Sequence, residues 1–542
     1  MEMNNINTIP AEKFGFAQRT DLKHDSKFDT KPVSYFQGAF RRFAKNKGAV
    51  VGGIVIIFLV LFAIIVPFIT PYSPSYNDTK FSHVTPRNKF FVNNNIDFWD
   101  GYREKQVSYL AYIKDKALEA ETGYDIVKND EYEVNEDGSL YTYRYNTYQG
   151  VGFGKYKIIS KEEYEDIQRY QNETGRQVLY PTVYYYDRPT LEKNMFDANI
   201  YYKVKNPKAA TLRPELDKDG NVIPNYWTYV AGQESEWGTL AEYNSLRIEG
   251  QDGFIDTIKV EDENGMLVDQ EAVCYYAYGR KVDGGIEVRA EYYEYYTYYH
   301  TQVLKDGIEE PNFVFGTTSN GKDILACLSY GARFSFIFAT LVAVVNFIVG
   351  IIYGSIAGYF GGRIDLFMER CSEILGSVPT MIVITLLKYH MGATSQAIVL
   401  FIAFFATGWI GMAGLTRMQF YRFKNQEYVL AARTLGARDR RVMFKHIFPN
   451  GLGTIVTSCA LTIPSMIYSE TSLSYLGIIN LEAGNTTSVG TLIAAGQKSV
   501  VANAGYVAFF PCMFLCMLML SFNLFGNGLR DAFNPSLRGS ED

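Results

Sequence analysis

The chain has 542 residues, a formal net charge of −6 and a mean hydropathy of −0.09, values that taken alone fit a soluble protein of several domains. The average conceals two opposite compositions, because long apolar runs stand beside a large acidic, tyrosine-rich part. These runs exclude a wholly soluble protein. The single cysteine of the acidic part, Cys274, excludes a disulfide framework there.

An amphipathic segment precedes the first apolar run. Residues 34–47 carry Phe36, Phe40 and Phe43 among four basic residues. This pattern is typical of a helix that lies on an anionic leaflet, and a merely basic flank fits it equally well. The run at 49–69 begins too late for a cleavable signal peptide and lacks a small-residue cleavage site, so we expect a permanent membrane span.

A long acidic insertion follows, from about Pro71 to Pro311. It holds 27 Lys and Arg residues against 42 Asp and Glu, an excess of 15 negative charges, and it is long enough to bury a core of its own. Helical spacing is predicted over 103–120 and 161–174. Four turn pairs flanked by alternating sequence predict β-hairpins: Asp137-Gly138, Asp219-Gly220, Asn264-Gly265 and Asp283-Gly284. We therefore expect a mixed α/β, β-rich domain.

The end of the insertion is a run of six tyrosines within residues 291–300. Tyrosines stack on rings and hydrogen-bond at their rims, so the run allows a sugar- or peptide-binding surface. Tyrosine is also a favoured strand residue on a half-buried face, and we predict structural alternation in a β-sheet. The functional alternative that we prefer is a docking surface for a substrate-capturing protein.

A glycine-rich stretch at 316–323, Gly-Thr-Thr-Ser-Asn-Gly-Lys-Asp, nearly matches a phosphate-binding loop. Asp323 stands where the hydroxyl that binds magnesium should be, and its carboxylate would oppose phosphate. The topology also places the stretch away from cytoplasmic ATP. We therefore reject a nucleotide site here and expect the energy source to be another chain.

Five further apolar runs, at 334–360, 374–392, 396–416, 452–476 and 504–526, bring the predicted spans to six. The third span is the weakest, since it is short and Pro379 interrupts it. Gly350, Gly354 and Gly358 in the second span form small-residue steps that favour close helix packing.

The fifth apolar run carries an acid and a helix breaker. Glu470 is costly in a membrane unless it faces water or a partner, so it is a candidate pathway residue, with helix-fixing hydrogen bonds or an interfacial position as the alternatives. Pro464 and Ser465 should break the helix locally and free backbone groups beside a cavity, which makes them candidate gate residues.

Between the fourth and fifth spans lies a short polar helix. Asn425 is placed to cap it, Glu427 lies in its first turn, Arg433 lies near its end, and Gly436 suits a left-handed closing residue. Small side chains at 431 and 432 would let a partner approach closely. Residues 417–446 hold eight basic residues against two acidic ones, which predicts a cytoplasmic loop and, with six spans, cytoplasmic termini.

This segment resembles the coupling loop of ATP-binding-cassette (ABC) importer permeases, with Leu430 where the family pattern has Glu. Further stretches resemble the C-type membrane subunit of oligopeptide and dipeptide importers: 316–323, 330–335, 357–365, Pro379, Ile463-Pro464, Glu470, 473–477 and 522–532. The resemblance covers about residues 34–75 and 312–538 and leaves out the insertion. Residues 482–488 also depart from it, since the family has a proline-rich stretch there.

The resemblance implies an all-α polytopic membrane protein, the six-span transmembrane domain of a type I ABC importer, with an extracytoplasmic insertion in a bacterial plasma membrane. The expected divisions are a cytoplasmic tail and interfacial helix (1–48), a first span (49–70), the insertion (71–311), a permease core (312–530) with its coupling loop (417–450), and a cytoplasmic tail (531–542). The coupling residues that it implies are Glu427, Ala431, Ala432, Gly436, Arg438, Asp439 and Pro449.

The implied function is ATP-driven import of short peptides delivered by an extracytoplasmic binding protein. The expected partners are a second, homologous permease subunit in a heterodimer, two cytoplasmic ATPase subunits that bind ATP and Mg, the binding protein and membrane lipid, with no nucleic acid. We expect no enzyme activity, cofactor or metal in this chain, because its five histidines are scattered and no metal-ligand spacing occurs.

Three alternatives remain open from the residues. The first is a membrane-anchored sensor or envelope-interaction protein whose outer domain is the active part. The second is an exporter, and the third is an importer of nickel complexes or oligosaccharides, which relatives in the family carry. A sensor has no need of a helix that faces an ATPase, and an importer needs a binding protein.

Overall fold

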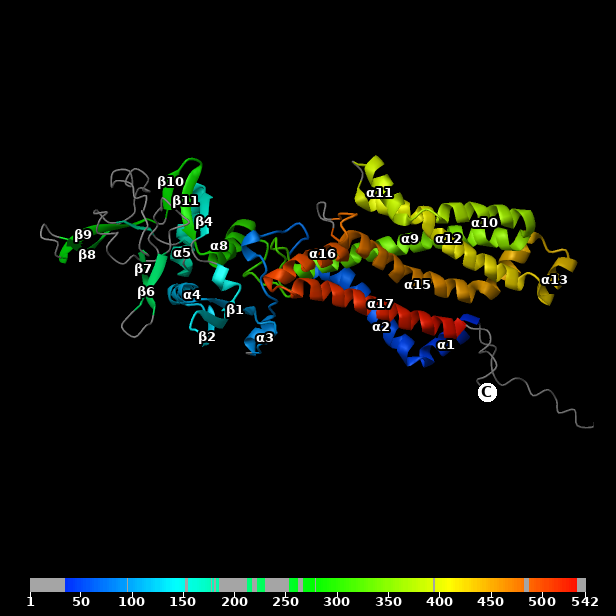
Figure 1. Ribbon diagram of the computed structural model, residues 1–542, viewed down its shortest axis with the longest axis horizontal. Coiled ribbons are helices and arrows are strands. Elements are labelled where there is room, and N and C mark those ends of the chain that lie inside the picture. Colours follow the sequence, from blue (N-terminus) through cyan, green and yellow to red (C-terminus); the bar gives the residue numbers. More distant parts are fainter. Residues whose placement is uncertain are drawn as a thin grey trace, which may run out of the picture.

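The computed structural model describes residues 35–94, 96–151, 155–176, 178–179, 182–184, 212–216, 222–229, 253–261, 267–277, 279–392, 395–481 and 487–533. The chain is elongated (Figure 1): a bundle of long helices occupies one part and the strands lie beyond one end of it. The described part of the insertion therefore lies mainly beyond that end of the bundle and extends the molecule along its length.

Five helices are long and apolar enough to cross a membrane: α2 (Lys47–Ile69), α9 (Ile324–Phe360), α12 (Gln396–Phe423), α15 (Phe448–Tyr475) with the turns before it, and α17 (Tyr506–Phe533). A sixth crossing is a bent pair, α10 (Gly362–Gly376) and α11 (Thr380–His390), with a 68° angle between its members. Among the described residues this gives five spans, or six with the bent pair. The helix α16 (Val489–Ser499) and the 3₁₀ turn η7 (Val500–Ala502) connect α15 to α17.

The prediction of a third span over 374–392 was wrong in its bounds. The pair begins at Gly362, and its bend lies at Pro379, which has no N–H and precedes the first residue of α11. The search for long apolar runs did not detect α10, because that helix is amphipathic and carries acidic and basic residues. The second span also begins ten residues earlier than predicted, where Asp323 accepts hydrogen bonds from the N–H groups of Leu325 (3.3 Å) and Ala326 (2.9 Å).

Close packing between α9 and α12 forms the centre of the bundle. A Cβ atom added at Gly350 would lie 2.6 Å from Met412 Cβ, and one at Gly354 would lie 2.2 Å from the Ala413 carbonyl oxygen. The same test at Gly358 gives 2.7 Å to Phe420 Cβ. The predicted packing role of these glycines is confirmed, because only a hydrogen atom fits at each position.

The helix α1 (Tyr35–Lys45) forms within the predicted amphipathic segment and lies against the end of α17. Arg42 donates two hydrogen bonds to the Ala532 carbonyl oxygen, at 3.0 and 2.8 Å, and the Phe43 and Phe525 rings meet edge to face at 5.2 Å. Phe40 on the same helix is 72% exposed. One side of α1 is thus held by the bundle while an aromatic side chain projects from it.

The insertion contains four antiparallel sheets among its described residues. Their strand orders are β1-β3-β2, β10-β11-β4, β5-β9-β8 and β6-β7. The strands are β1 (Tyr102–Ser108), β2 (Val127–Val134), β3 (Leu140–Asn146), β4 (Lys155–Ile159), β5 (Thr182–Tyr184), β6 (Leu212–Leu216), β7 (Val222–Tyr229), β8 (Gly253–Glu261), β9 (Leu267–Ala277), β10 (Gly279–Val282) and β11 (Gly285–Ala290). The helices are α3 (Lys89–Asn93), α4 (Tyr109–Thr122), α5 (Lys161–Thr174) and α8 (Tyr292–Tyr298), with the short turns η3 (Thr79–Phe81), η4 (Gln149–Val151) and η5 (Tyr299–Leu304).

Each of the four predicted turn pairs lies between two strands that pair with each other: β2 with β3, β6 with β7, β8 with β9, and β10 with β11. The pairs at 219–220 and 264–265 themselves lie outside the described residues. The helix predicted at 161–174 is confirmed as α5, which Ser160 caps and Gly175 closes with φ +70°. The prediction at 103–120 was wrong in its first part, where β1 pairs with β3 along seven residues.

The prediction that the tyrosine run forms strands was wrong, because residues 292–298 form the helix α8. Tertiary packing decides this, since α8 is buried on two sides. Tyr295 and Tyr298 pack into the core of α5 and β11, whereas Tyr293 and Tyr296 pack with Phe81. The helix therefore connects the core of the insertion to the segment that joins it to the bundle.

Candidate functional site

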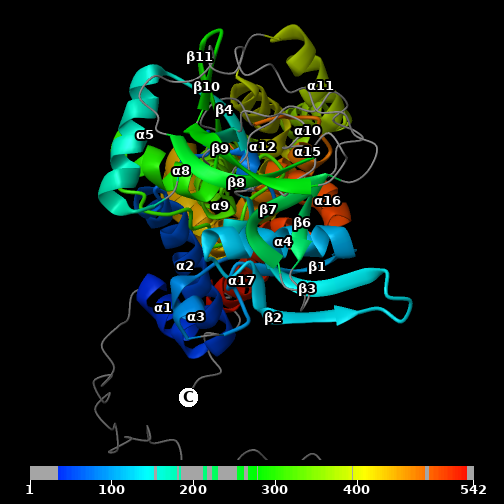
Figure 2. The same ribbon diagram turned by 90° about the vertical axis from the view of Figure 1, so that its left-hand side faces the viewer.

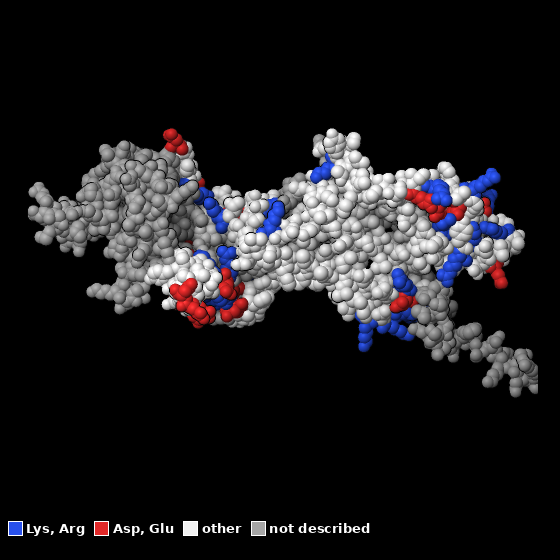
Figure 3. Space-filling model, in the orientation of Figure 1, with Lys and Arg blue, Asp and Glu red and all other residues white. Residues whose placement is uncertain are grey.

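The candidate coupling segment, residues 417–450, lies at the end of the bundle farthest from the insertion (Figure 1). It contains α13 (Glu427–Thr434), α14 (Asp439–Arg441) and the π-helical turn η6 (Val442–Ile447). Lysine and arginine side chains gather at this end of the molecule (Figure 3). A short helix within a strongly basic segment thus lies at this end of the apolar bundle.

The helix α13 begins after Gln426, whose side chain makes no capping hydrogen bond, so the prediction that Asn425 caps it was wrong. Its closure follows the prediction: Gly436 has φ +81°, and the N–H groups of Gly436 and Ala437 donate to the carbonyl oxygens of Arg433 (2.9 Å) and Ala432 (3.1 Å). A Cβ atom at Gly436 would meet nothing within 4 Å. Glycine is required here by the backbone conformation and not by crowding.

Most of the predicted coupling residues lie on the open side of the segment. Leu435, next to Gly436, is 88% exposed. Glu427, Ala431, Gly436, Arg438, Asp439 and Pro449 are exposed and Ala432 is half-buried. Pro449 lies in the first turn of α15, which is a different helix from α13. The open side of the segment therefore combines small side chains with exposed large apolar ones, among them Leu430 and Leu435.

The inner side of α13 is fixed to the bundle. Val429 is fully buried, in a cluster with Phe420, Val442 and Ile447. The hydroxyl of Tyr359, at the end of α9, donates to Asp439, and the Arg433 guanidinium lies 5.0 Å from the centre of the Tyr359 ring. Movement of α13 would consequently move the ends of α9 and α15 with it.

A partly buried ion pair connects α10 to Arg417, the residue of α12 at which this segment begins. Arg417 donates from Nε (2.6 Å) and Nη2 (2.7 Å) to the two carboxylate oxygens of Asp365, which also accepts from the Tyr421 hydroxyl (2.6 Å). Lys424 donates to the Gly358 carbonyl oxygen (3.0 Å), and desolvation lowers the pKa of its ammonium group while the Asp365 carboxylate opposes that shift. The network ties three helices together at the end that carries α13.

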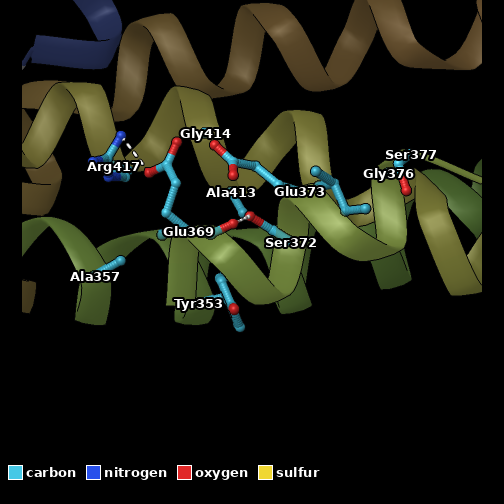
Figure 4. Close-up of a pocket in the computed structure, with 12 residues that line it drawn as sticks. Tyr353, Ala357, Glu369, Ser372, Glu373, Gly376, Ser377, Ala413, Gly414 and Arg417 are labelled. Atoms are coloured by element: carbon cyan, nitrogen blue, oxygen red, sulfur yellow. Dashed lines mark hydrogen bonds and ion pairs between the residues drawn. The ribbon is translucent and has the colours of Figure 1, made fainter. Parts of the chain in front are cut away.

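A polar groove of about 400 Å³ opens between α9, α10 and α12 (Figure 4). Glu369 reaches from α10 toward α12 and forms an ion pair with Arg417 at 2.6 Å. The remaining lining combines small residues with polar ones: Tyr353, Gly354, Ala357, Ser372, Glu373, Gly376, Ser377, Ile410, Ala413 and Gly414. Polar side chains in an otherwise apolar bundle mark a surface that meets water, substrate or another subunit.

The candidate gate residues on α15 do not lie in this groove. The helix continues without a break through Pro464, which is buried, and the exposed Ser465 donates to the Leu461 carbonyl oxygen (3.1 Å). The prediction of a local break was therefore wrong. Glu470 is fully buried and accepts hydrogen bonds from Ser335 (2.8 Å) and Ser474 (3.1 Å), so it joins α15 to α9.

We expect Glu470→Leu to lower the thermal stability of the purified chain and Glu470→Gln to preserve most of it. Leucine leaves two buried hydroxyls without their acceptor, at a cost of about 1–3 kcal/mol each, whereas glutamine retains groups that bond to both. Thermal unfolding in detergent measures the difference. Equal losses in the two variants would show that hydrogen bonding at this position does not hold α15 to α9.

Sequence reasoning assigned no role to Tyr359, Asp365, Glu369 or Tyr421. Tyr359 and Asp365 lie in a stretch that was noted only for its family resemblance, and Arg417 was counted only as one of eight basic residues. An acidic residue within or next to an apolar run of the sequence is a signal of function. This signal identified Glu470 and could also have identified Asp365. Its partner is 52 residues away in sequence, so only the fold could show the pair.

Two family descriptions match the chain. Residues 34–86 match the N-terminal TM domain of oligopeptide transport permease C, and residues 350–539 match the binding-protein-dependent transport system inner membrane component. Neither match includes residues 87–349, which contain most of the insertion.

Individual relatives agree with these matches. The chain is 41% identical over 244 residues to the oligopeptide transport system permease protein OppC of Bacillus subtilis, covering 45% of this chain and 78% of that protein. It is 39% identical over 224 residues to the dipeptide transport system permease protein DppC of the same organism, covering 41% and 69%. For OppC of Escherichia coli K12 the identity is 36% over 229 residues, covering 42% and 74%.

The helices and these matches define a polytopic, helical membrane permease. The chain belongs to the family of oligopeptide and dipeptide ABC transporter permeases, among their C-type subunits. It is thus a transporter subunit, and the sensor alternative is not favoured.

Proposed function

We propose that this chain is one of two different permease subunits of a type I ABC importer for short peptides. Two ATPase subunits that bind ATP and Mg would engage the coupling segment, and a binding protein would deliver the peptide on the opposite side. The observation that carries the proposal is α13 itself: its buried Val429 anchors it to the bundle, while Ala431 and Leu435 are exposed on its outer side.

The mechanism follows from how α13 is attached. ATP binding would close the ATPase pair and move α13 with its docking groove. Arg433 of α13 contacts the Tyr359 ring at the end of α9, and Tyr359 also donates a hydrogen bond to Asp439 of α14. The displacement of α13 would therefore be transmitted to the spans as rigid elements. The spans would then rock between inward and outward openings around the pathway. The chain would convert closure of the ATPases into access for the peptide.

The charge distribution supports the orientation. The coupling segment and the ends of α1 and α17 carry the basic residues Arg42, Arg417, Arg438 and Arg530 close to one end of the bundle. By the positive-inside rule this end is cytoplasmic, together with both termini. The insertion, joined at the opposite ends of α2 and α9, is then extracytoplasmic in a bacterial plasma membrane.

The polar groove is the part of the bundle that we assign to the translocation pathway of the peptide. Two carboxylates, Glu369 and Glu373, line it beside Ser372 and Ser377, and small residues keep it open. This lining suits a peptide, because the backbone N–H groups and the terminal ammonium group of a peptide need hydrogen-bond acceptors. The groove lies between helices that α13 would move, so its width would depend on the state of the ATPases.

Purification of the tagged chain from its native membranes tests the assembly. We expect two ATPase chains and a second permease to co-purify in mild detergent. Recovery of the second permease without any ATPase chain would contradict the coupling role of α13.

For the insertion we propose contact with the binding protein or delivery of the substrate. Deletion of about residues 80–305 should reduce peptide uptake and weaken binding-protein affinity, while the chain still enters the membrane. Uptake of a radiolabelled peptide and binding-protein titration in nanodiscs measure both effects. Unchanged uptake together with unchanged affinity would remove this role.

A further inference from the structure

A compact group of large apolar side chains lies exposed at the edge of the insertion. The group, which we term the α3 aromatic cluster, consists of Phe90, Phe91, Ile96, Phe98 and Trp99. Phe90 is 64%, Ile96 41% and Phe98 60% exposed. The rings contact one another, with Phe98 stacked on Trp99 at 5.2 Å and Phe91 edge-on to Phe98 at 5.8 Å. Exposed apolar groups that are gathered in this way mark a surface with a partner.

The cluster lies level with the end of a membrane span. The Trp99 ring lies 5.7 Å from Phe510, one turn into α17, and 5.9 Å from Phe315. Arg530 marks the other end of α17, and a hydrocarbon layer about 30 Å thick takes roughly 20 helical residues. Counting back from Arg530 reaches Phe510. Trp99 therefore lies at the boundary of the hydrocarbon layer, where tryptophan is favoured.

A second span gives the same level. The same count of roughly 20 residues from Lys47, at the start of α2, reaches Pro67. The two residues that follow, Phe68 and Ile69, are 75% and 72% exposed. Two helices thus place one membrane boundary beside the cluster.

The cluster also lies beside the bundle and not on top of it. Seen from the insertion end (Figure 2), α3 lies in front of α1, outside α2 and α17, and Figure 1 shows both short helices on the same flank, separated along the long axis. Between them α2 exposes the apolar side chains of Ile54, Ile57, Phe58 and Leu61. In a membrane protein this flank is covered by lipid acyl chains, so the cluster continues a lipid-facing surface.

Charges around the cluster are paired. Lys89 contacts Glu310 at 3.0 Å, and Asp97 contacts Lys128 (2.5 Å) and Arg144 (3.0 Å). The basic partners neutralise the acidic residues of these pairs. The surface around the cluster can therefore approach phospholipid headgroups without being repelled by an anionic leaflet.

We propose that the α3 aromatic cluster is a membrane anchor, which inserts into the headgroup region of the leaflet on the insertion side. The occupant of this surface is the phospholipid bilayer. The anchor acts together with the covalent connections at α2 and α9 and gives the insertion a third point of support. It thereby sets the height and tilt of the insertion above the pathway. Its assignment to the outer leaflet rests on the proposed orientation, whereas contact with lipid does not.

Site-specific photo-crosslinking tests the anchor in the full chain. Two single variants are made, in which p-benzoylphenylalanine replaces either Phe98 or Phe90. Each assembly is reconstituted in nanodiscs of phosphatidylethanolamine and phosphatidylglycerol. Tyr132, an aromatic residue on β2 that is 50% exposed, is the matched control position. After irradiation, mass spectrometry of the intact chain should show phospholipid adducts at positions 98 and 90 in at least fivefold excess over position 132.

Two results would overturn the anchor. One is an adduct yield at 98 and 90 that is no higher than at 132, which would mean that the cluster faces water. The other is cross-linking of these positions to the second permease or to a binding protein, which would make the cluster a protein interface. Co-purification of ATPase chains with the substituted chain is measured in parallel. If these chains co-purify normally, either result would contradict the anchor alone and not the proposed function.

Discussion

Gly436→Asp should abolish most of the peptide uptake while the chain accumulates in the membrane at its usual level. Gly436 has φ +81°, a conformation that costs an ordinary residue about 1–2 kcal/mol, and it closes the helix that we propose to contact an ATPase. The substituted position is exposed and a Cβ atom there meets no neighbour, so the bundle is unaffected. A coupling free energy of about 1–3 kcal/mol corresponds to a 5- to 150-fold effect. We expect the rate of uptake to decrease by a factor within that range.

A bulky residue at Ala432 should act in the same way, because this half-buried position lets a partner approach the helix closely. Uptake and substrate-stimulated ATP hydrolysis in proteoliposomes are the measurements for both variants. Gly175→Asp is the matched control, since Gly175 also closes a helix with φ +70° and a Cβ atom there would likewise meet nothing within 4 Å, yet it lies in the insertion. Normal uptake and normal stimulation in Gly436→Asp would refute the docking role.

Gly354→Ala should lower the thermal unfolding temperature of the purified chain by several degrees. The added methyl group would lie 2.2 Å from the Ala413 carbonyl oxygen and 2.8 Å from Thr416 Cβ, so α9 and α12 would have to separate. Overpacking of this kind costs typically about 1–3 kcal/mol. The loss should also reduce transport, because the polar groove lies between the same helices.

Gly411→Ala provides the control for that measurement. Gly411 lies on α12, and a Cβ atom there meets nothing within 4 Å. Alanine also has the higher helix propensity, so this variant should be as stable as the parent or slightly more stable. If both alanine variants shifted the unfolding temperature equally, close contact between α9 and α12 would not be what stabilises the bundle.

The sequence by itself determined the features that depend on local chemistry and on composition. Apolar length located five of the crossings, glycine spacing located the face of α9 that packs closely against another helix, and turn pairs located the hairpins of the insertion. Closure of α13 at Gly436 was also predictable, because a left-handed residue after a helix is a local requirement. These signals are read within a few residues and need no knowledge of what lies across the fold.

Only the tertiary structure decided the features that depend on distant neighbours. The tyrosine run forms a helix because two separate cores bury it from two sides, which outweighs the strand preference of tyrosine. Asp365 and Arg417 form a pair across 52 residues of sequence, and Glu470 reaches Ser335 across 135. A buried ionisable side chain takes its role from the groups that bond to it, and the distant ones are brought near by folding and not by the chain around it.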